Sequence, residues 1–399
     1  MTSQRIILHV DADAFFVSVE QALHPELAGL AVIVGGSNRG VVSSASYEAR
    51  RLGVHSAMPI AHARRLCPHA VFLKPNFEAY SHFSRQMFDI MRAYSPEVEA
   101  TSIDEGYVDL TGTLRLHKAP PWEIAHRLLN GIRTILSINA SGGIAGSKSE
   151  AKMATGLAKP NGLIYLDPAN SHIILGGLSA SAIPGVGKRA SEILNRHGIK
   201  TVRDIAGAGP KLVRSLLGEW GERIVEIASG NDSRPVCSGP SDPRRSYSRD
   251  RTLASDTRDR RFVRDMAWEL GENLAAKLRR DGRAASTLTV KIRYHDFSQV
   301  SKSATLRHAS QDTTEILDVV DRLLTKALIK KDSVRQVGVK LSGITSPCHQ
   351  EDLFDPLRPM RLRRDRAVDT IRDRFGFHAI RPARTMGRGS ETVSKLGGA

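Results

Sequence analysis

Three carboxylates in two short segments are the side chains of this sequence best suited to chemistry. Asp11 follows the apolar run Ile7–Val10, and Asp104 and Glu105 open a second run with strand character. If adjacent strands bring these three acids together, their negative charges repel one another unless cations neutralise them. Carboxylates are hard oxygen ligands, and such ligands favour Mg²⁺. Two such ions activate an attacking hydroxyl and stabilise a leaving phosphate. Asp104 and Glu105 can serve one site only at a strand end or turn, because neighbours on a strand face opposite sides.

Taken singly, each of these acids has a simpler interpretation. Most Asp and Glu residues are helix caps, turn formers or solvated charges. A site is therefore indicated only if other segments of the chain agree with it.

Composition limits the class of protein. The chain has 399 residues, 41% of them hydrophobic and 25% charged, enough for a substantial core in roughly two to four domains. A net charge of +16 and a pI near 10.0 favour a polyanionic partner such as nucleic acid, with a merely basic soluble protein as the alternative. Three scattered cysteines indicate neither disulfides nor zinc. Without a signal sequence or a long apolar stretch, we expect a cytoplasmic protein that does not enter a membrane.

The elements that must position the carboxylates follow from hydrophobic periodicity. Apolar or alternating runs predict strands, and apolar residues three and four apart predict helices. The predicted strands are 6–10, 31–34 and 286–294, and the predicted helices are 122–136, 189–196, 316–324, a short one at 367–375 and one beginning near Thr201. The stretch 233–251 is polar and rich in Pro, Gly and Arg, which is typical of a linker. About half of the net positive charge lies in residues 241–350.

Three motifs carry a resemblance to a known family. The run Val10-Asp-Ala-Asp-Ala-Phe-Phe16 with Glu20, the run Ser102-Ile-Asp-Glu-Gly-Tyr-Val-Asp109, and the run Ser46-Tyr-Glu-Ala-Arg50 are similar to signature segments of Y-family DNA polymerases. The likeness is greatest to the bacterial polymerase IV, or DinB, branch, and covers roughly residues 5 to 350. It implies an α+β multidomain fold shaped like a right hand, with a palm sheet, small fingers, a helical thumb containing a helix-hairpin-helix, and an α/β little finger.

The resemblance also implies domain boundaries. Residues 1–170 would form the palm and fingers, with fingers at about 25–80 inserted in the palm. The remaining predicted segments are a thumb at 171–235, a linker at 236–246, a little finger at 247–349 and a basic C-terminal tail at 350–399.

By the same resemblance, Asp11 and Asp104 would be metal ligands together with the backbone of Ala12. Glu105 would be the third carboxylate, assisting two Mg²⁺ ions and the primer 3′-hydroxyl. These three acids would therefore be the catalytic residues.

Four further residues would receive the incoming deoxynucleoside triphosphate (dNTP). Tyr47 and Arg50 are three residues apart and so share one face if their segment is helical, and Arg binds phosphate oxygens in bidentate fashion. Lys159 stands beside a turn marked by Pro160. Phe16 would be the steric gate that excludes a 2′-hydroxyl, although core packing is the commoner fate of an aromatic residue.

One segment departs from the family pattern. The family usually has an apolar residue where Glu150 stands. Whether Lys148 and Lys152 are active-site residues therefore stays open.

Two segments are predicted to bind macromolecules. Gly185, Gly187 and Lys188 lie in a glycine-rich turn before a helix, which can offer backbone N–H groups to DNA phosphates. Gln350, Leu353 and Phe354 are similar to the peptide with which bacterial polymerases bind the sliding clamp.

The function predicted from these features is template-directed DNA synthesis of low fidelity that bypasses lesions. The expected partners are primer-template DNA, dNTPs and the clamp, and we expect a monomer. Two alternatives remain open: a catalytically silent polymerase-like adaptor, and a nuclease that uses the acids for hydrolysis.

We expect Phe16→Ala to raise ribonucleotide incorporation, because removing the ring makes room for a 2′-hydroxyl. Single-nucleotide insertion with matched dNTP and rNTP measures this. An unchanged preference for dNTP would remove the steric-gate assignment.

Overall fold

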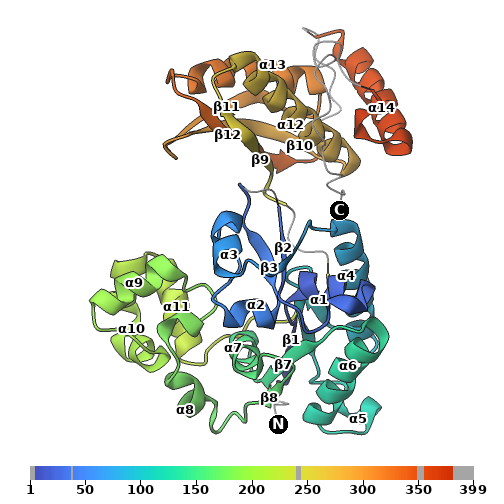
Figure 1. Cartoon of the computed structure of the whole chain (residues 1–399). Helices are drawn as coiled ribbons and strands as arrows, with labels where there is room; N and C mark the ends of the chain where they lie inside the picture. Colours follow the sequence, from blue (N-terminus) through green and yellow to red (C-terminus); the bar gives the residue numbers. More distant parts are fainter. Residues whose placement is uncertain (1–4, 37–38, 240–243, 348–354, 381–399) are drawn as a thin grey trace. The chain divides into compact units, whose positions relative to one another are not determined.

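The computed structural model describes residues 5–36, 39–239, 244–347 and 355–380 (Figure 1). The chain divides into two compact units between residues 240 and 241, within the predicted linker. The finer boundaries predicted inside the first unit stay predictions. Gln350, Leu353 and Phe354 lie outside the described residues. No helix of the described residues combines the length and apolarity needed to cross a membrane.

A five-stranded sheet in the order β5-β6-β1-β7-β8 lies at the centre of the first unit. Its strands are β1 (Ile7–Ala12), β5 (Val98–Ala100), β6 (Glu105–Asp109), β7 (Ala140–Ala145) and β8 (Leu163–Tyr165). β1 runs antiparallel to both of its neighbours, β6 and β7. Because β1 is central, any group at its end lies between two other strands.

Helices cover both faces of this sheet. The helices α4 (Phe77–Arg92) and α6 (Pro121–Leu136) join the cluster that contains Leu8, whereas α7 (Lys148–Ala158) joins the cluster that contains Ile7. Since side chains alternate along a strand, Asp11 shares the α7 face with Ile7. α7 therefore lies on the same side of the sheet as the first predicted carboxylate.

A smaller sheet, β3-β2-β4, forms a second layer of apolar packing in the region predicted as fingers. Its elements, with the short helices nearby, are α1 (Phe15–Leu23), η1 (Pro25–Leu27), β2 (Val32–Gly35), β3 (Val42–Ala45), α2 (Tyr47–Arg51), α3 (Ile60–Leu66) and β4 (Val71–Leu73). α5 (Leu114–His117) precedes α6.

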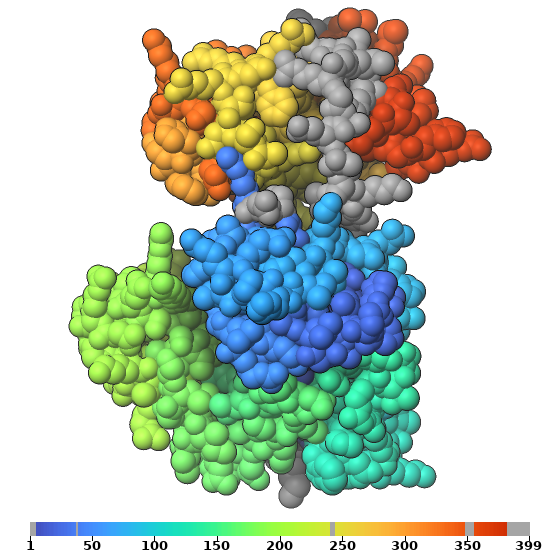
Figure 2. Space-filling model, in the orientation of Figure 1, coloured from blue at the N-terminus to red at the C-terminus, as the bar shows by residue number. Residues whose placement is uncertain are grey.

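The helices after β8 form a lobe at one side of the first unit (Figure 2). They are α8 (Ser171–Gly176), η2 (Ala180–Ala182), α9 (Lys188–Arg196), α10 (Val202–Leu217) and α11 (Trp220–Ala228). Thr201 caps α10 in a reciprocal capping box with Asp204, which confirms the helix start predicted near Thr201.

The second unit is a four-stranded antiparallel sheet, β11-β10-β12-β9, packed against helices. Its elements are β9 (Ser246–Thr257), α12 (Arg260–Arg280), β10 (Ala284–Tyr294), β11 (Gln299–Ser310), α13 (Thr313–Ala327), β12 (Val334–Thr345), α14 (Arg358–Phe375) and η3 (Phe377–Ala379). The predicted helix at 367–375 is correct in type but too short, because charged contacts hold the preceding residues in α14 as well. The mixed α/β architecture agrees with the predicted fold class.

Gly143 in β7 lets α7 approach the sheet closely. A Cβ at this position would lie 2.3 Å from the Ala151 carbonyl oxygen and 2.5 Å from the Thr155 backbone nitrogen. The backbone of α7 cannot yield as the end of a flexible side chain can. α7 would have to move away from β7.

We therefore expect Gly143→Ala to lower the free energy of unfolding by about 3 kcal/mol, the upper part of the range for overpacking. Chemical denaturation measures this. Gly156→Ala in α7 is the matched control: its Cβ meets nothing within 4 Å, so it should leave stability unchanged or raise it by up to about 1 kcal/mol. Equal effects of the two substitutions would contradict the packing argument.

Candidate active site

The three predicted acidic residues lie at one end of the β1–β6 pair. Asp11 lies directly opposite Glu105 in the antiparallel register. Asp104 lies in the turn before β6, and its carbonyl oxygen accepts a hydrogen bond of 2.9 Å from the Ala12 backbone N–H. The turn removes the constraint that adjacent strand residues face opposite sides. The structure thus brings together all four positions predicted to surround the metal.

Cationic and hydroxyl side chains contact each of these acids. Lys159 Nζ lies 2.5 Å from Asp11 Oδ1, and Lys152 donates to Glu105. The Ser102 hydroxyl donates to Asp104. The two lysines partly neutralise the negative charge that the strand pairing concentrates here.

The pKa values of the acids reflect this environment. Burial raises the pKa of Asp11, against the opposing effect of Lys159, and the charges of Asp104 and Glu105 raise it further. His9 and Lys152 instead lower the pKa of Glu105 to about 2. Glu105 is therefore ionised throughout the neutral range, and Asp11 is more stable beside an additional cation.

The donor set suits a hard divalent cation, since all three side chains offer carboxylate oxygens. In the ranges that the structure describes, no three His, Cys, Asp or Glu side chains converge closely enough to hold one ion. The lysines contact the oxygens that such an ion would need. The carboxylates therefore suit a metal ion chemically. Lys159 and Lys152 would have to give up their contacts with Asp11 and Glu105 before those oxygens could coordinate the ion.

Two residues not predicted as site residues contact predicted ones. Asp13 is buried and accepts hydrogen bonds from the Ser141 hydroxyl at 2.9 Å, the Asn161 N–H at 2.7 Å and the Tyr47 hydroxyl at 3.2 Å. His9 is also buried, with Nε2 3.6 Å from Glu105 Oε2. The sequence signal was their spacing of two residues from Asp11, His9 on β1 and Asp13 in the turn that follows it.

Phe16 lies in the first turn of α1, just after the left-handed Ala14 turns the chain out of β1. Its half-buried ring stacks on Tyr80, with 4.3 Å between ring centroids, and meets Phe77 edge-on. Tyr80 is anchored by a 2.5 Å hydrogen bond to Glu20. The ring predicted as the steric gate is therefore held from behind and cannot retreat without disturbing packed aromatic residues.

Tyr47 and Arg50 share a face of α2, as their spacing predicts. The Arg50 guanidinium lies 4.7 Å from the Tyr47 ring centroid, and its Nε donates to the Ala45 carbonyl oxygen at 3.0 Å. Burial and the neighbouring Asp13 raise the pKa of Tyr47 to about 12. Tyr47 is therefore a neutral hydrogen-bond donor beside the exposed Arg50 cation.

The structure separates the two lysines that the sequence left open. Lys152 reaches Glu105, whereas Lys148 Nζ binds Glu99 Oε2 at 2.5 Å on β5. Glu150, which stands where the family is usually apolar, accepts a 2.9 Å hydrogen bond from Ser171 at the start of α8. Of the two, only Lys152 belongs with the carboxylates.

The glycine-rich turn has the geometry of a hairpin between short helices. Gly185 has φ +99°, and a Cβ there would lie 2.6 Å from Trp220, so both conformation and space require glycine. Gly187 is the N-cap of α9 and Lys188 its exposed first residue, and no side chain caps that end. The N–H groups at this end are therefore available to an anion.

Asp232 connects the helical lobe to α7. It is fully buried and binds Arg223 at 2.7 Å, Arg234 at 2.7 Å and the Ser149 hydroxyl at 2.6 Å. Burial raises its pKa, but the hydrogen bonds from Arg234 and Ser149 outweigh this and bring the pKa below the usual range. Its charge is thus stabilised by the fold.

Comparisons with known proteins identify the family. The impB/mucB/samB family model matches residues 10–156, and the model of that family's C-terminal domain matches residues 244–353. A DNA polymerase IV of Dehalococcoides mccartyi is 39% identical over 384 residues, 96% of this chain and 97% of the relative. A solved Y-family DNA polymerase chimera is 28% identical, with a TM-score of 0.75 over 86% of this chain and 100% of its own. This chain belongs to the Y family of DNA polymerases.

Other Y-family structures match over the same span. An insertion ternary complex of Dbh DNA polymerase is 28% identical, with a TM-score of 0.58, over 86% of this chain and 100% of its own. Membership of the Y family confirms the predicted fold class and implies the use of divalent metal ions. The roles of individual site residues stay predictions.

We expect Asp232→Asn to lower the free energy of unfolding by about 2 kcal/mol at pH 7, because it removes the charge-assisted hydrogen bonds that the buried Asp232 accepts from Arg223 and Arg234. Since the folded-state pKa lies below that of the unfolded chain, ionised Asp232 stabilises the fold above about pH 4. The stability that ionised Asp232 contributes is lost as pH falls through the pKa of Asp232 in the folded state. The difference between wild type and variant should therefore narrow in acid.

Urea denaturation between pH 3 and 7 measures this. Glu226→Gln is the matched control, because the exposed Glu226 binds Arg223 at the surface and should change stability by less than about 0.5 kcal/mol. A difference for Asp232→Asn that is constant with pH would contradict the electrostatic explanation.

Proposed function

We propose that Asp11, Asp104 and Glu105 form the catalytic site with two Mg²⁺ ions. As a Y-family member the chain is a DNA-directed DNA polymerase of the translesion type. The observation that carries the site assignment is the β1–β6 register, which sets Asp11 opposite Glu105 with Asp104 bonded to the next residue, Ala12. When bound, the ions supply activation of the primer hydroxyl and stabilisation of the leaving pyrophosphate.

The surrounding side chains bind and orient the substrate. In the reaction the primer 3′ oxygen bonds to the α-phosphorus of the dNTP, and the bond from that phosphorus to pyrophosphate breaks. Lys159, which contacts Asp11, and the exposed Arg50 bind phosphate oxygens of the triphosphate, and neutral Tyr47 donates to it in exchange for its hydrogen bond to Asp13. Phe16, supported by Tyr80, lies under the sugar and selects deoxyribose.

The wider chain holds the DNA. Gly185, Gly187 and Lys188 bind a backbone phosphate at the start of α9, and the basic second unit binds the duplex independently of sequence. A sliding clamp binds Gln350, Leu353 and Phe354. The enzyme works as a monomer in the cytoplasm.

Primer extension with dNTPs and Mg²⁺, on undamaged and lesion-bearing templates, tests this function. We expect Asp104→Ala to reduce extension at least about a hundredfold, because it removes a metal ligand. Asp89→Ala is the matched control, since Asp89 is an exposed acid of α4 that pairs with Arg92, and should extend normally. Extension by Asp104→Ala at the wild-type rate would defeat the mechanism, whereas primer degradation would indicate a nuclease.

A further inference from the structure

His9 of β1 is a buried histidine beside the candidate active site, and one of its ring nitrogens is unpaired. Its side chain is 1% exposed, and Nδ1 lies 3.0 Å from the Thr155 hydroxyl oxygen on α7. Nε2 lies 3.6 Å from Glu105 Oε2, beyond hydrogen-bond range, and accepts or donates no hydrogen bond within the residues that the structure describes. Such buried, unpaired nitrogens are uncommon, so this one requires a physical explanation.

Packing on two sides fixes the position of the His9 ring. His9 lies opposite Tyr107 on β6 and opposite Gly143 on β7, and the His9 and Tyr107 ring centroids are 4.7 Å apart. Gly143 lets α7 approach the sheet, which brings Thr155 against the ring. The imidazole therefore has little room to rotate, and its Nε2 edge stays directed at Glu105.

The neighbouring groups decide which ring nitrogen carries the proton. Because the pKa of Glu105 is about 2, its carboxylate only accepts hydrogen bonds, so Nε2 must be the donor if the two groups are not to repel each other. Nδ1 is then an acceptor, and the Thr155 hydroxyl, which also lies 2.9 Å from the Ala151 carbonyl oxygen, can turn its single proton to Nδ1. Burial lowers the pKa of His9, so the ring carries one proton at neutral pH. A doubly protonated ring would donate through Nε2 as well.

Lys152 holds the carboxylate oxygen that His9 faces. It donates to Glu105 Oε2, the oxygen that lies 3.6 Å from Nε2. If a cation displaces Lys152, Oε2 loses this donor while the buried Nε2–H stays beside it. A shift of about 0.4 Å then brings the pair within hydrogen-bond range, since N–H···O bonds extend to about 3.2 Å.

We propose that His9 is a positioning residue: its Nε2–H donates to Glu105 Oε2 once Lys152 withdraws, and Glu105 Oε1 is left for a divalent cation. Oε1 is the freer oxygen, because its contact with the Thr101 hydroxyl is 3.4 Å long. Thr155 fixes the required tautomer from the other side of the ring. The inference rests on the proposed role of Glu105 as the assisting carboxylate. Hydrogen bonds that orient metal-binding carboxylates are worth about 10- to 100-fold in metal affinity or activity.

Two amide side chains at position 9 separate the two ring nitrogens. The amide nitrogen of Gln reaches the place of Nε2, whereas that of Asn reaches the place of Nδ1. In single-turnover primer extension, His9→Asn should lower the maximal rate constant at least about tenfold, whereas His9→Gln should stay within about threefold of wild type. The apparent Kd for dNTP should be the same in both, because the contacts described for His9 are with Glu105, Tyr107 and Thr155 and not with the residues proposed to bind the triphosphate.

Thr155 provides a second test that preserves the volume of the core. Thr155→Val keeps the shape of the side chain but removes the hydroxyl, so Nδ1 loses its donor and the ring proton can move to Nδ1. We expect Thr155→Val to lower the maximal rate constant about tenfold, and Thr155→Ser, which keeps the hydroxyl, to restore it. Urea denaturation shows that each variant is folded under the assay conditions, so unfolding cannot account for a lower rate.

NMR of the ring nitrogens identifies the tautomer in the full chain without added metal ions. With nitrogen-labelled histidine, the His9 signals are those missing from His9→Gln. We expect the proton on Nε2 in wild type. In Lys152→Met we expect the Nε2–H resonance to move downfield, because the freed Glu105 carboxylate shortens the hydrogen bond.

Three results would each overturn the inference: a proton on Nδ1 alone, an Nε2–H resonance that Lys152→Met leaves in place, or equal rate constants for folded His9→Gln and His9→Asn. Glu105→Ala separates the inference from the function on which it rests. If Glu105→Ala extends primers at the wild-type rate, the assisting role of Glu105 fails and the positioning role of His9 fails with it. If Glu105→Ala is impaired while both His9 variants extend normally, only the positioning role fails.

Discussion

The antiparallel pairing of β1 with β6 concentrates negative charge at one point, and the rest of the first unit is arranged around that constraint. Asp11 and Glu105 face each other across the pair because the register leaves them no alternative. Like charges at this distance are costly unless cations approach them. Lys152 and Lys159 come from within α7 and just after it, so the position of this single helix decides the electrostatics of the site.

The approach of α7 depends in turn on features remote from the acids. Gly143 leaves room for its backbone against β7. Asp232 binds Ser149 at its first turn and so ties the helical lobe to the same helix. The geometry of the candidate active site and the attachment of the helical lobe thus both depend on α7. A change that displaces α7 would affect both.

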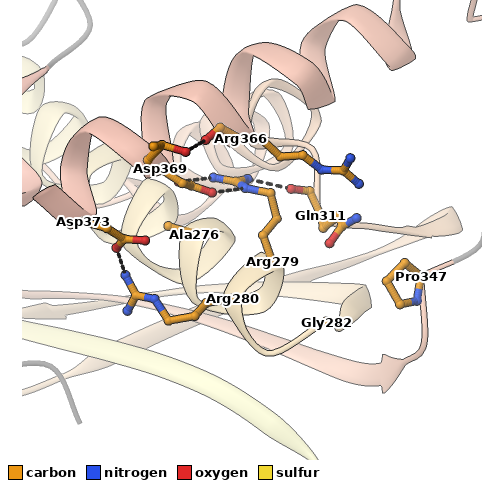
Figure 3. Close-up of a pocket in the computed structure, with 10 residues that line it drawn as sticks. Ala276, Arg279, Arg280, Gly282, Gln311, Pro347, Arg366, Asp369 and Asp373 are labelled. Carbon is orange, nitrogen blue, oxygen red and sulfur yellow. Dashed lines mark hydrogen bonds and ion pairs between the residues drawn. The ribbon is translucent and has the colours of Figure 1, made fainter.

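The second unit shows a different use of charge. The facing helices α12 and α14 form ionic contacts where an apolar interface is usual. The pairs are Arg279 with Asp369 and Arg280 with Asp373 (Figure 3). This orders α14 without consuming its apolar side chains.

The sequence by itself determined the residue types, the local elements and the family. The apolar run before Asp11, the helical spacing of Tyr47 and Arg50, and the helix start near Thr201 are all local, so periodicity and turn chemistry predicted them. The motifs placed Phe16, Asp104 and Glu105 in segments that the structure does bring towards one region. The helix α14 was predicted too short, and other elements, among them α4, α7 and β7, were not predicted.

The tertiary structure alone decided which charges meet. Lys159 contacts Asp11 across 148 positions, and Lys152 rather than Lys148 reaches Glu105. Asp13, two residues after Asp11, is buried and accepts a hydrogen bond from the Asn161 backbone N–H. Such pairings depend on how closely two elements pack and on their rotation about their own axes. Local spacing in the sequence contains neither of these quantities. Two lysines that look alike in the sequence therefore acquire different partners only when the chain folds.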